Sequence, residues 1–516
     1  MATMDQVDAV IVGSGPNGLV AAAVLARAGW RVLVLERAAV PGGAVQSAEL
    51  TVPGYVHDTY SAFYGMLHAS PAFGELGLDR RVRWAQFAQP VAAAIGPEAV
   101  VRCHADAIAT AAELPAPDGE AWLELVRWWD RVGRRFFEVL LGPVGALGPA
   151  LKLAAVARPR GLLDLTRMQL QPMEALARDR FAGSRGRVLL AGGASHTDIA
   201  VDQPGSVPAA LILAMVAQQV GMPVPVGGAR QLAAALVGAV EDAGGQVRSH
   251  ADVTRVIVEK GRAVGVETGD GGSVRARRAV LADTGPAALF TRLMDPDLLP
   301  AHFLAGLRQF RYGTGVFKLD LALDGPVPWQ SPELATCGVV HVVGDLDNMA
   351  AAGFQARRGY LPSAPMLIVG QQSVADPSRA PAGGHTLWAE THVPPVPREG
   401  GTWTPAVRDR FLDVVLDRLE AHAPGLRSRI VGTAVRTPVD LEAENPNLVG
   451  GDLGAGSSAL DQQLIFRPVP GWFRYGTPVK GLYLCSASAH PGGGVHGMAG
   501  RNCARRVLGD ARFRRI

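Results

Sequence analysis

The segment DAVIVGSGPNGLVAAAVLARAGWRVLVLE, residues 8–36, constrains the fold more than any other part of the chain. It opens with an apolar run, which is typical of a strand buried on both faces. A glycine-rich turn, an alanine- and leucine-rich stretch that Gly29 ends, and a second apolar run follow in that order. This order predicts a strand, a helix and a parallel second strand, and therefore an α/β fold.

The turn after the first strand has the spacing Gly-x-Gly-x-x-Gly, at Gly13, Gly15 and Gly18. The first glycine allows a tight turn, the second lets the backbone approach a diphosphate, and the third lets the helix pack closely on the strand. The helix N-terminus offers free N–H groups and a partial positive charge. Glu36, eighteen residues beyond Gly18, can accept hydrogen bonds from ribose hydroxyls. We therefore predict a dinucleotide site that includes the whole loop: Gly13, Ser14, Gly15, Pro16, Asn17 and Gly18.

A second glycine pair, Gly42 and Gly43, follows the second strand in the sequence ERAAVPGGA. This arrangement resembles the FAD-binding flavoproteins of the glutathione-reductase type, in which such a pair leads the chain back along the cofactor. The resemblance implies a Rossmann-like FAD-binding domain of that type, with cofactor contacts from Arg37, Gly42, Gly43 and Ala44. Amine-oxidase relatives usually have Arg after the pair, so Ala44 weighs against that branch.

The sequence GLYLCSASAHPGGGVHGMAGRNCARRVLG, residues 481–509, repeats the pattern of strand, glycine-rich loop and helix. It predicts a strand at Leu482 to Cys485 and a helix from about His496 towards Leu508. A loop almost free of Cβ atoms suits contact with a flat ring, and the helix dipole would stabilise the negative charge of a reduced flavin. The alternative is a glycine-rich surface loop. The expected cofactor contacts are Ser486, Ala487, Gly493, Gly494, Val495, His496 and Gly497.

These C-terminal residues closely resemble the signature of phytoene-desaturase-like flavoproteins, a family that includes carotenoid desaturases and ketolases and the proteins named for a pyridine nucleotide-disulfide oxidoreductase domain. Residues 224–272 resemble the middle section of that family, and residues 460–484 resemble the approach to its terminal signature. The resemblance implies FAD as the cofactor. It also implies an adenine contact from the backbone of Val253, for which a purely structural hairpin is the alternative.

The nucleotide-binding pattern is confined to three separate segments, which predicts a flavin domain interrupted by an inserted α+β substrate domain. We expect the FAD-binding domain in residues 1–75, 222–290 and 450–516, and the substrate domain in residues 76–221 and 291–449. Just before the last glycine loop, Asp461 and Arg467 are expected to form a buried ion pair that supports it.

In the first substrate segment, Trp122, Leu125 and Trp129 recur at helical spacing with Arg127 and Arg131 between or beside them. This helix is either a cap packed on its own domain or a helix on a membrane surface that admits an apolar substrate. The prolines at 143, 149 and 159 predict a set of short helices after it.

A flavin accepts a hydride at N5, so the implied reaction is oxidation of a C–H bond next to carbon, nitrogen or oxygen, with desaturation as the first expectation. His490, His496 and His57 are candidate catalytic residues, because imidazole titrates near neutral pH. For His490 and His496 the alternative is a role in shaping the loop.

Composition excludes several classes of partner. The net charge is only +3 and the arginines are scattered among acids, so we expect no nucleic-acid binding. The four cysteines lack metal-ligand spacing, and no metal site is expected. The N-terminus lacks signal-peptide features and residues 136–157 include charges and prolines, which favours a cytoplasmic protein, with peripheral membrane contact as the alternative.

The predicted function is that of an FAD-dependent oxidoreductase that transfers a hydride from a C–H bond of a small hydrophobic organic substrate to flavin N5. No second dinucleotide fingerprint occurs, so electrons are expected to leave to oxygen, a quinone or another acceptor. The alternatives are a flavin-dependent isomerase without net redox change, an amine oxidase-like enzyme, and a flavin-binding interaction protein without turnover. The sequence determines neither the substrate nor the oligomeric state.

Overall fold

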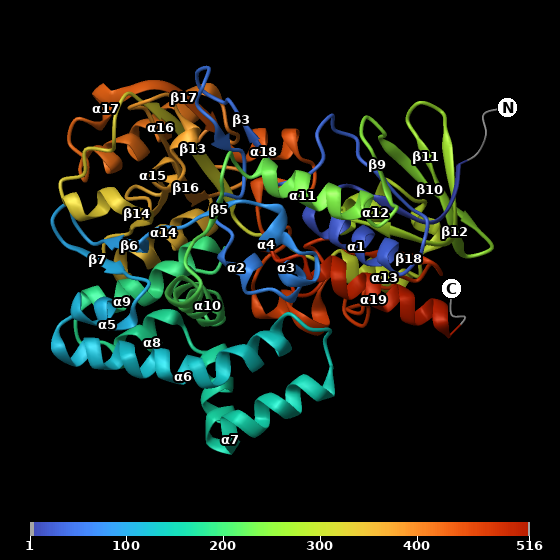
Figure 1. Cartoon of the computed structure of the whole chain (residues 1–516), viewed down its shortest axis with the longest axis horizontal. Coiled ribbons are helices and arrows are strands. Elements are labelled where there is room, and N and C mark those ends of the chain that lie inside the picture. The colour runs from blue at the N-terminus through green and yellow to red at the C-terminus, as the bar shows by residue number, and fades with distance from the viewer. Residues whose placement is uncertain (1–4, 514–516) are drawn as a thin grey trace.

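Two seven-stranded sheets organise the chain in the computed structural model, which describes residues 5–513. The sheets lie towards opposite ends of the long axis, and both termini lie at the same end (Figure 1). Two short strand pairs complete the strands: β3 (Ser47–Ala48) with β4 (His57–Asp58), and β5 (Trp84–Ala85) with β8 (Val224–Pro225).

The first sheet has a parallel core drawn from both ends and the middle of the chain. β1 is parallel to its neighbours β2 and β12, β9 is parallel to β2, and β18 is parallel to β12. β10 and β11 extend the sheet as an antiparallel hairpin. The bounds are β1 (Asp5–Val12), β2 (Val32–Leu35), β9 (Gln246–Arg248), β10 (Val253–Glu259), β11 (Arg262–Thr268), β12 (Ser273–Ala282) and β18 (Leu482–Leu484).

Helix α1 (Pro16–Arg27) joins β1 to β2, which confirms the predicted strand, helix and parallel strand. Pro16 is suited to the first helical position because its missing N–H has no intrahelical partner there. Gly29, at φ +83°, follows the helix in the left-handed conformation that commonly ends helices. α1 packs on α11 (Arg230–Glu241) and on the C-terminal helix α19 (Met498–Arg512), so the two ends of the chain meet at one helix pair.

The second sheet is mixed and has two unlike faces. Its strands in spatial order are β17 (Ile430–Arg436), β13 (Gly315–Leu323), β16 (His385–Val393), β15 (Leu367–Gly370), β14 (Cys337–Val342), β6 (Gln89–Ala94) and β7 (Val100–Cys103). Side chains alternate along a strand, so Phe317 and Leu319 join the apolar core under α16 (Pro405–Glu420), whereas Lys318 and Asp320 point to the opposite side. We call that opposite side the charged face.

Three helices lie below the second sheet in Figure 1: α10 (Ser206–Gln219) and, lower in the view, α6 (Ala116–Leu140) and α7 (Leu147–Leu170). α7 consists of two helical pieces that meet at a kink, as the prediction of short helices after residue 143 requires. Pro149 falls in its first turn, where no intrahelical N–H is needed. The break comes at Arg158, whose φ of 61° precedes Pro159.

The remaining α-helices of the described residues have at most twelve residues each. They are α2 (Gly65–His68), α3 (Pro71–Glu75), α4 (Leu78–Arg81), α5 (Ala107–Ala112), α8 (Met173–Arg180), α9 (Ser184–Ala191), α12 (Pro286–Thr291), α13 (Ala301–Leu307), α14 (Leu346–Arg357), α15 (Gln372–Ala375), α17 (Leu426–Arg429) and α18 (Pro438–Glu444). Across residues 5–513, none of the helices combines the length and the apolar character that crossing a bilayer requires.

Candidate active site

The predicted diphosphate loop lies between β1 and α1. Gly13 has φ +92°, a conformation that favours glycine. The other glycine pair closes on the loop, because a Cβ added at Gly43 would stand 2.9 Å from the Cα of Gly15. The N-cap residue of α1, Gly15, has no side chain to cap the first turn, so the positive dipole end of the helix is open to an anion.

A buried carboxyl group that the sequence analysis missed lies beneath this loop. Asp283 follows β12, and its Oδ2 accepts a hydrogen bond of 2.8 Å from the N–H of Gly18. A Cβ added at Gly15 would stand 2.5 Å from the same oxygen. Burial raises the pKa of Asp283 to about 7. The available signal was the end of a buried strand, VLAD, but only the pairing of β12 with β1 shows where that end lies.

Glu36 lies at the end of β2 and is nearly buried. Its Oε2 accepts hydrogen bonds from the N–H of Ser14 at 2.9 Å and from the Ser14 hydroxyl at 2.7 Å, and its Oε1 accepts one from the N–H of Ala38 at 2.8 Å. The carboxylate thereby fixes the shape of the diphosphate loop. Its contact with a ribose stays a prediction, as does any cofactor contact from the neighbouring Arg37, which donates to the carbonyl of Glu444 at 3.2 Å.

The C-terminal glycine loop meets the N-terminal loop through α1 and α19. The N–H of Gly500 donates to the side-chain oxygen of Asn17 at 3.3 Å, across 483 positions of sequence. A Cβ at Gly500 would overlap the carbonyl group of Asn17, so this close approach requires glycine. Ahead of α19, Gly493 and Gly494 are exposed, as contact with a ring requires. The structure thus brings the two predicted cofactor loops together.

Arg467 fastens the segment beside this loop. Its guanidinium donates to the carbonyls of Ala455 at 3.2 Å, Ser457 at 3.0 Å and Ala487 at 2.9 Å. The expected ion pair with Asp461 was wrong, since Asp461 lies at the surface and pairs with Arg311 at 2.8 Å. Backbone carbonyls therefore accept from both terminal nitrogens of the buried guanidinium, without the cost of burying a carboxylate. Burial lowers the pKa of Arg467 to about 10.

His490 and His496 are both fastened to backbone groups. His490 donates from Nε2 to the carbonyl of Gly142 at 2.9 Å, and the N–H of Met498 donates to Nδ1 of His496 at 3.1 Å. Burial lowers the pKa of each histidine to about 4, so both rings are neutral at pH 7. These contacts support the loop-shaping alternative, and a role in proton transfer stays a prediction.

His57 lies inside an ionic cluster rather than at an open surface. It is 2% exposed, its Nε2 lies 2.9 Å from the hydroxyl of Thr51, and its Nδ1 lies 3.7 Å from Oδ1 of Asp320. Burial and the positive charge of Lys318 lower the pKa of His57 to about 3, so the ring is neutral. A catalytic role for His57 stays a prediction.

The charged face carries most of this cluster. Lys318 and Asp320 are fully buried and form an ion pair of 2.5 Å, and Arg436 on the adjacent strand lies 3.4 Å from the same aspartate. A neighbouring group links this region to α11, because Asp58 pairs with Arg379 at 2.9 Å and accepts a hydrogen bond of 2.8 Å from the N–H of Ala229, the residue before that helix. So many buried charges survive only because they are paired.

Glu390 is the carboxyl group on the charged face that lacks an ion-pair partner among the described residues. It stands opposite Lys318 in the register of β13 and β16, yet among the described residues its buried Oε2 has no hydrogen-bond partner. Burial raises the pKa of Glu390 to about 7. The sequence analysis did not single out this residue. The available signal was charge on the inward positions of apolar strands, as in VFKLDLAL.

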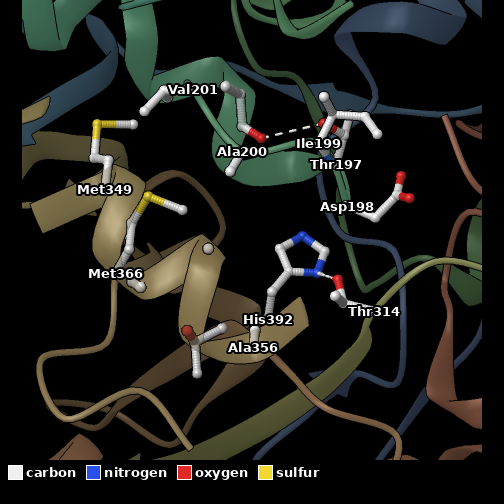
Figure 2. Close-up of a pocket in the computed structure, with 14 residues that line it drawn as sticks. Thr197, Asp198, Ile199, Ala200, Val201, Thr314, Met349, Ala356, Met366 and His392 are labelled. Atoms are coloured by element: carbon white, nitrogen blue, oxygen red, sulfur yellow. Dashed lines mark hydrogen bonds between the residues drawn. The ribbon is translucent and has the colours of Figure 1, made fainter. Parts of the chain in front are cut away.

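A small cavity of about 30 Å³ lies where α14 and the turn after α9 approach β16 (Figure 2). Its lining is mainly apolar and includes Met349 and Met366, with His392 held by the hydroxyl of Thr314 at 2.9 Å. A further histidine pair lies nearby: Nε2 of His196 is 3.0 Å from Nε2 of His341.

Residues 17–508 match the flavin-containing amine oxidoreductase family. The chain belongs to this family. It is similar to pyridine nucleotide-disulfide oxidoreductase domain-containing protein 2 of Mus musculus, at 29% identity over 98% of this chain and 93% of that protein. It is also similar to the neurosporene-forming phytoene desaturase of Cereibacter sphaeroides, at 26% identity over 95% and 92% of the two chains. A limonene dehydrogenase protein of Castellaniella defragrans is 25% identical over 99% and 96%.

Solved structures show the same fold. An oxidoreductase from Methanosarcina mazei superposes with a TM-score of 0.62 at 16% identity, covering 97% of this chain and 99% of that one. A triple mutant of putrescine oxidase superposes with a TM-score of 0.61 at 17% identity, covering 99% of each chain. The predicted mixed α/β fold, FAD as cofactor and the resemblance to phytoene-desaturase-like enzymes are therefore confirmed. The protein is an FAD-dependent oxidoreductase.

Proposed function

We propose that the enzyme is a desaturase or dehydrogenase that removes a hydride from a C–H bond of a hydrophobic organic substrate. The observation that carries the proposal is the meeting of the two glycine loops at the α1–α19 pair, which provides one site for a diphosphate and a flat ring. Bound FAD supplies a hydride acceptor at N5. Two relatives are named for phytoene and limonene, which are hydrocarbons and fit this substrate class.

Each part of FAD can be assigned to one part of the chain. We assign the diphosphate to the N-terminus of α1, the ribose to Glu36, the adenine to the backbone of Val253 at the start of β10, and the ring to residues 486–497. This arrangement is that of a Rossmann-like domain of the glutathione-reductase type, built from residues 1–75, 222–290 and 450–516. Residues 76–221 and 291–449 would then form the substrate domain.

Desaturation of a carbon–carbon bond removes a proton as well as a hydride, so a proton acceptor is required. A candidate is Glu390 on the charged face, whose Oε2 has no partner among the described residues and whose pKa burial raises to about 7. Lys318 opposite compensates the charge of the carboxylate. The two electrons left on the flavin would pass to oxygen, a quinone or another acceptor.

We also propose that the protein meets membranes through α7 rather than α6. The aromatic face of α6 is buried, with Trp122 and Trp129 inside the second domain, as the cap alternative requires. α7 instead leaves Leu147 77% and Leu163 72% exposed and carries four basic residues against one acidic residue. Exposed leucines between basic side chains suit an anionic lipid surface from which an apolar substrate could enter.

The test is an absorption spectrum of the pure protein, mass analysis of the molecule released on denaturation, and anaerobic titration with phytoene, limonene and putrescine. We expect FAD and bleaching of the flavin by a hydrocarbon. Bleaching by putrescine alone would instead identify an amine oxidase, which the family match keeps as the second candidate. An isomerase would instead convert a hydrocarbon only when its flavin is reduced beforehand, and without net oxidation. If none of the three compounds bleached the flavin, a flavin-binding protein without turnover would be favoured.

A further inference from the structure

Asp283 is a buried acid without a basic partner at the point where an anionic cofactor would bind. It is 7% exposed, and within residues 5–513 no lysine, arginine or histidine forms an ion pair with it. Four of the other eight buried carboxylates among the described residues are paired with a cation: Asp58, Asp320, Asp376 and Asp510. A buried acid is expensive to ionise without such a partner, so its position calls for an explanation.

The carboxyl group of Asp283 lies at the positive end of α1. β12 is parallel to β1, the N–H of Asp283 donates to the carbonyl of Val12 at 2.8 Å, and the side chain therefore emerges beneath the glycine loop. Its Oδ2 accepts the N–H of Gly18 at 2.8 Å, which is one of the N–H groups that α1 leaves free of intrahelical bonds. The ionised carboxylate and a diphosphate would therefore draw on the same helix dipole.

Three groups face this carboxyl group from the surrounding elements. Glu36, at the end of β2, is negative and opposes ionisation of Asp283, whereas the N–H of Gly18 favours it. The third is the buried thiol of Cys485, after β18, whose pKa lies well above its usual value and which is therefore neutral. Burial outweighs the hydrogen bond and leaves the pKa of Asp283 at about 7, so the free protein holds both protonation states near neutral pH.

We propose that Asp283 is a positioning residue of the FAD site that takes up a proton when the diphosphate binds. This inference rests on the proposed binding of FAD at the α1 loop. The negative charge of the diphosphate acts on Asp283 in the same direction as Glu36 and makes its neutral form the favoured one. The neutral carboxyl group still accepts the N–H of Gly18 and keeps the loop in shape, but it no longer opposes the phosphate charge.

The sign of the pH dependence follows from this linkage. Below pH 7 Asp283 is already protonated in the free protein, so FAD affinity is constant there. Above pH 7 each bound FAD must bring in a proton, and affinity falls by up to about tenfold per pH unit until the pKa of the bound state is reached. We expect the affinity at pH 8.5 to be more than about tenfold weaker than at pH 6.5.

The experiment measures FAD binding to the apoprotein by flavin fluorescence between pH 6 and pH 9, without any substrate. Asp283→Asn keeps an acceptor for Gly18 but cannot ionise, so its affinity should match the unmodified protein at pH 6.5 and stay flat above it. The matched control is Asp118→Asn. Asp118 is also buried and accepts backbone N–H groups, from Ala182 at 2.7 Å and Gly183 at 2.8 Å, but on α6. This variant should keep the pH dependence.

A second measurement needs no variant and therefore remains decisive if Asp283→Asn fails to fold. Calorimetric titration of FAD into the unmodified apoprotein at pH 8, in two buffers with different ionisation heats, should show uptake of about one proton per FAD. A flat affinity profile, no proton uptake, or a pH dependence that survives in Asp283→Asn would overturn the inference alone. A folded apoprotein that binds no FAD at any pH would overturn the proposed function with it.

Discussion

The diphosphate loop and the charged face of the second sheet are both buried, but they are built from different groups. The loop uses glycines, backbone N–H groups and the end of α1, all within residues 13–18. The charged face uses ionisable side chains that come from positions as far apart as Asp58 and Arg379. A site built from closely packed backbone is disrupted by an added side-chain atom, whereas a buried ionic site is disrupted by the loss of a charge. We therefore expect the loops to be sensitive to substitutions that add atoms, and the charged face to substitutions that remove a charge.

The largest loss of stability and of FAD binding is expected when an atom is added between α1 and α19, beside the two predicted cofactor loops. Gly500→Ala would force a methyl group into the carbonyl of Asn17 and separate α1 from α19. We expect a loss of stability of about 3 kcal/mol or more and loss of FAD binding, since overpacking and backbone displacement act together. Thermal unfolding and flavin fluorescence would measure both.

The matched control for that variant lies on the same helix. Gly509 has no other heavy atom within 4 Å of an added Cβ, apart from its own helix backbone, so Gly509→Ala should leave FAD binding unchanged and stabilise the protein by up to about 1 kcal/mol. If both variants behaved alike, helix propensity rather than close approach would explain Gly500, and the first half of the comparison would fail.

The next largest effect is expected from removing a charge on the other side of the comparison. Lys318→Met keeps most of the side-chain volume but leaves the buried Asp320 without its 2.5 Å partner. We expect a loss of about 3 to 5 kcal/mol in the free energy of unfolding, with the loop itself unaffected. Arg255→Met breaks an ion pair at the exposed surface and should change stability little. Chemical denaturation compares the two, and equal losses would show that burial is not the deciding factor.

These two regions also differ in how far the sequence alone predicts them. The β1–α1–β2 unit and the last strand, loop and helix are local, because spacing and periodicity within about 30 residues determine them. Asp283 could not be assigned to the loop, since 265 residues separate it from Gly18 and only the pairing of β12 with β1 joins them. Arg467 was assigned the wrong partner, because sequence proximity to Asp461 says nothing about which carbonyls surround a buried guanidinium.

A smaller effect is expected on the pH dependence of stability, and it concerns Glu390 on the charged face. The pKa of Glu390 is raised in the folded protein to about 7, above its ordinary value of 4.5, so folding favours the neutral acid. The raised pKa of Glu390 stabilises the folded protein by up to about 3 kcal/mol. This stabilisation is fully present below pH 4.5 and is lost as the pH rises through 7. Glu390→Gln should lack this loss. Unfolding at pH 5 and pH 8 measures the difference, and an identical pH dependence in both proteins would exclude Glu390 as its source.

The smallest effect on stability is expected at the exposed leucines of α7, such as Leu163, because these side chains lie mostly in solvent. Leu163→Gln should leave stability and FAD binding unchanged and lower binding to vesicles of anionic phospholipid severalfold, since one leucine loses its transfer into the lipid interface. Leu298→Gln, an exposed leucine outside α7, is the matched control and should bind vesicles normally. Equal binding by all three proteins would remove α7 from the membrane surface. A change in the oligomeric state of Leu163→Gln, measured by light scattering, would assign the exposed leucines to a second copy of the chain. In either case the helical periodicity of α7, like that of α6, identifies an apolar face without showing what covers it.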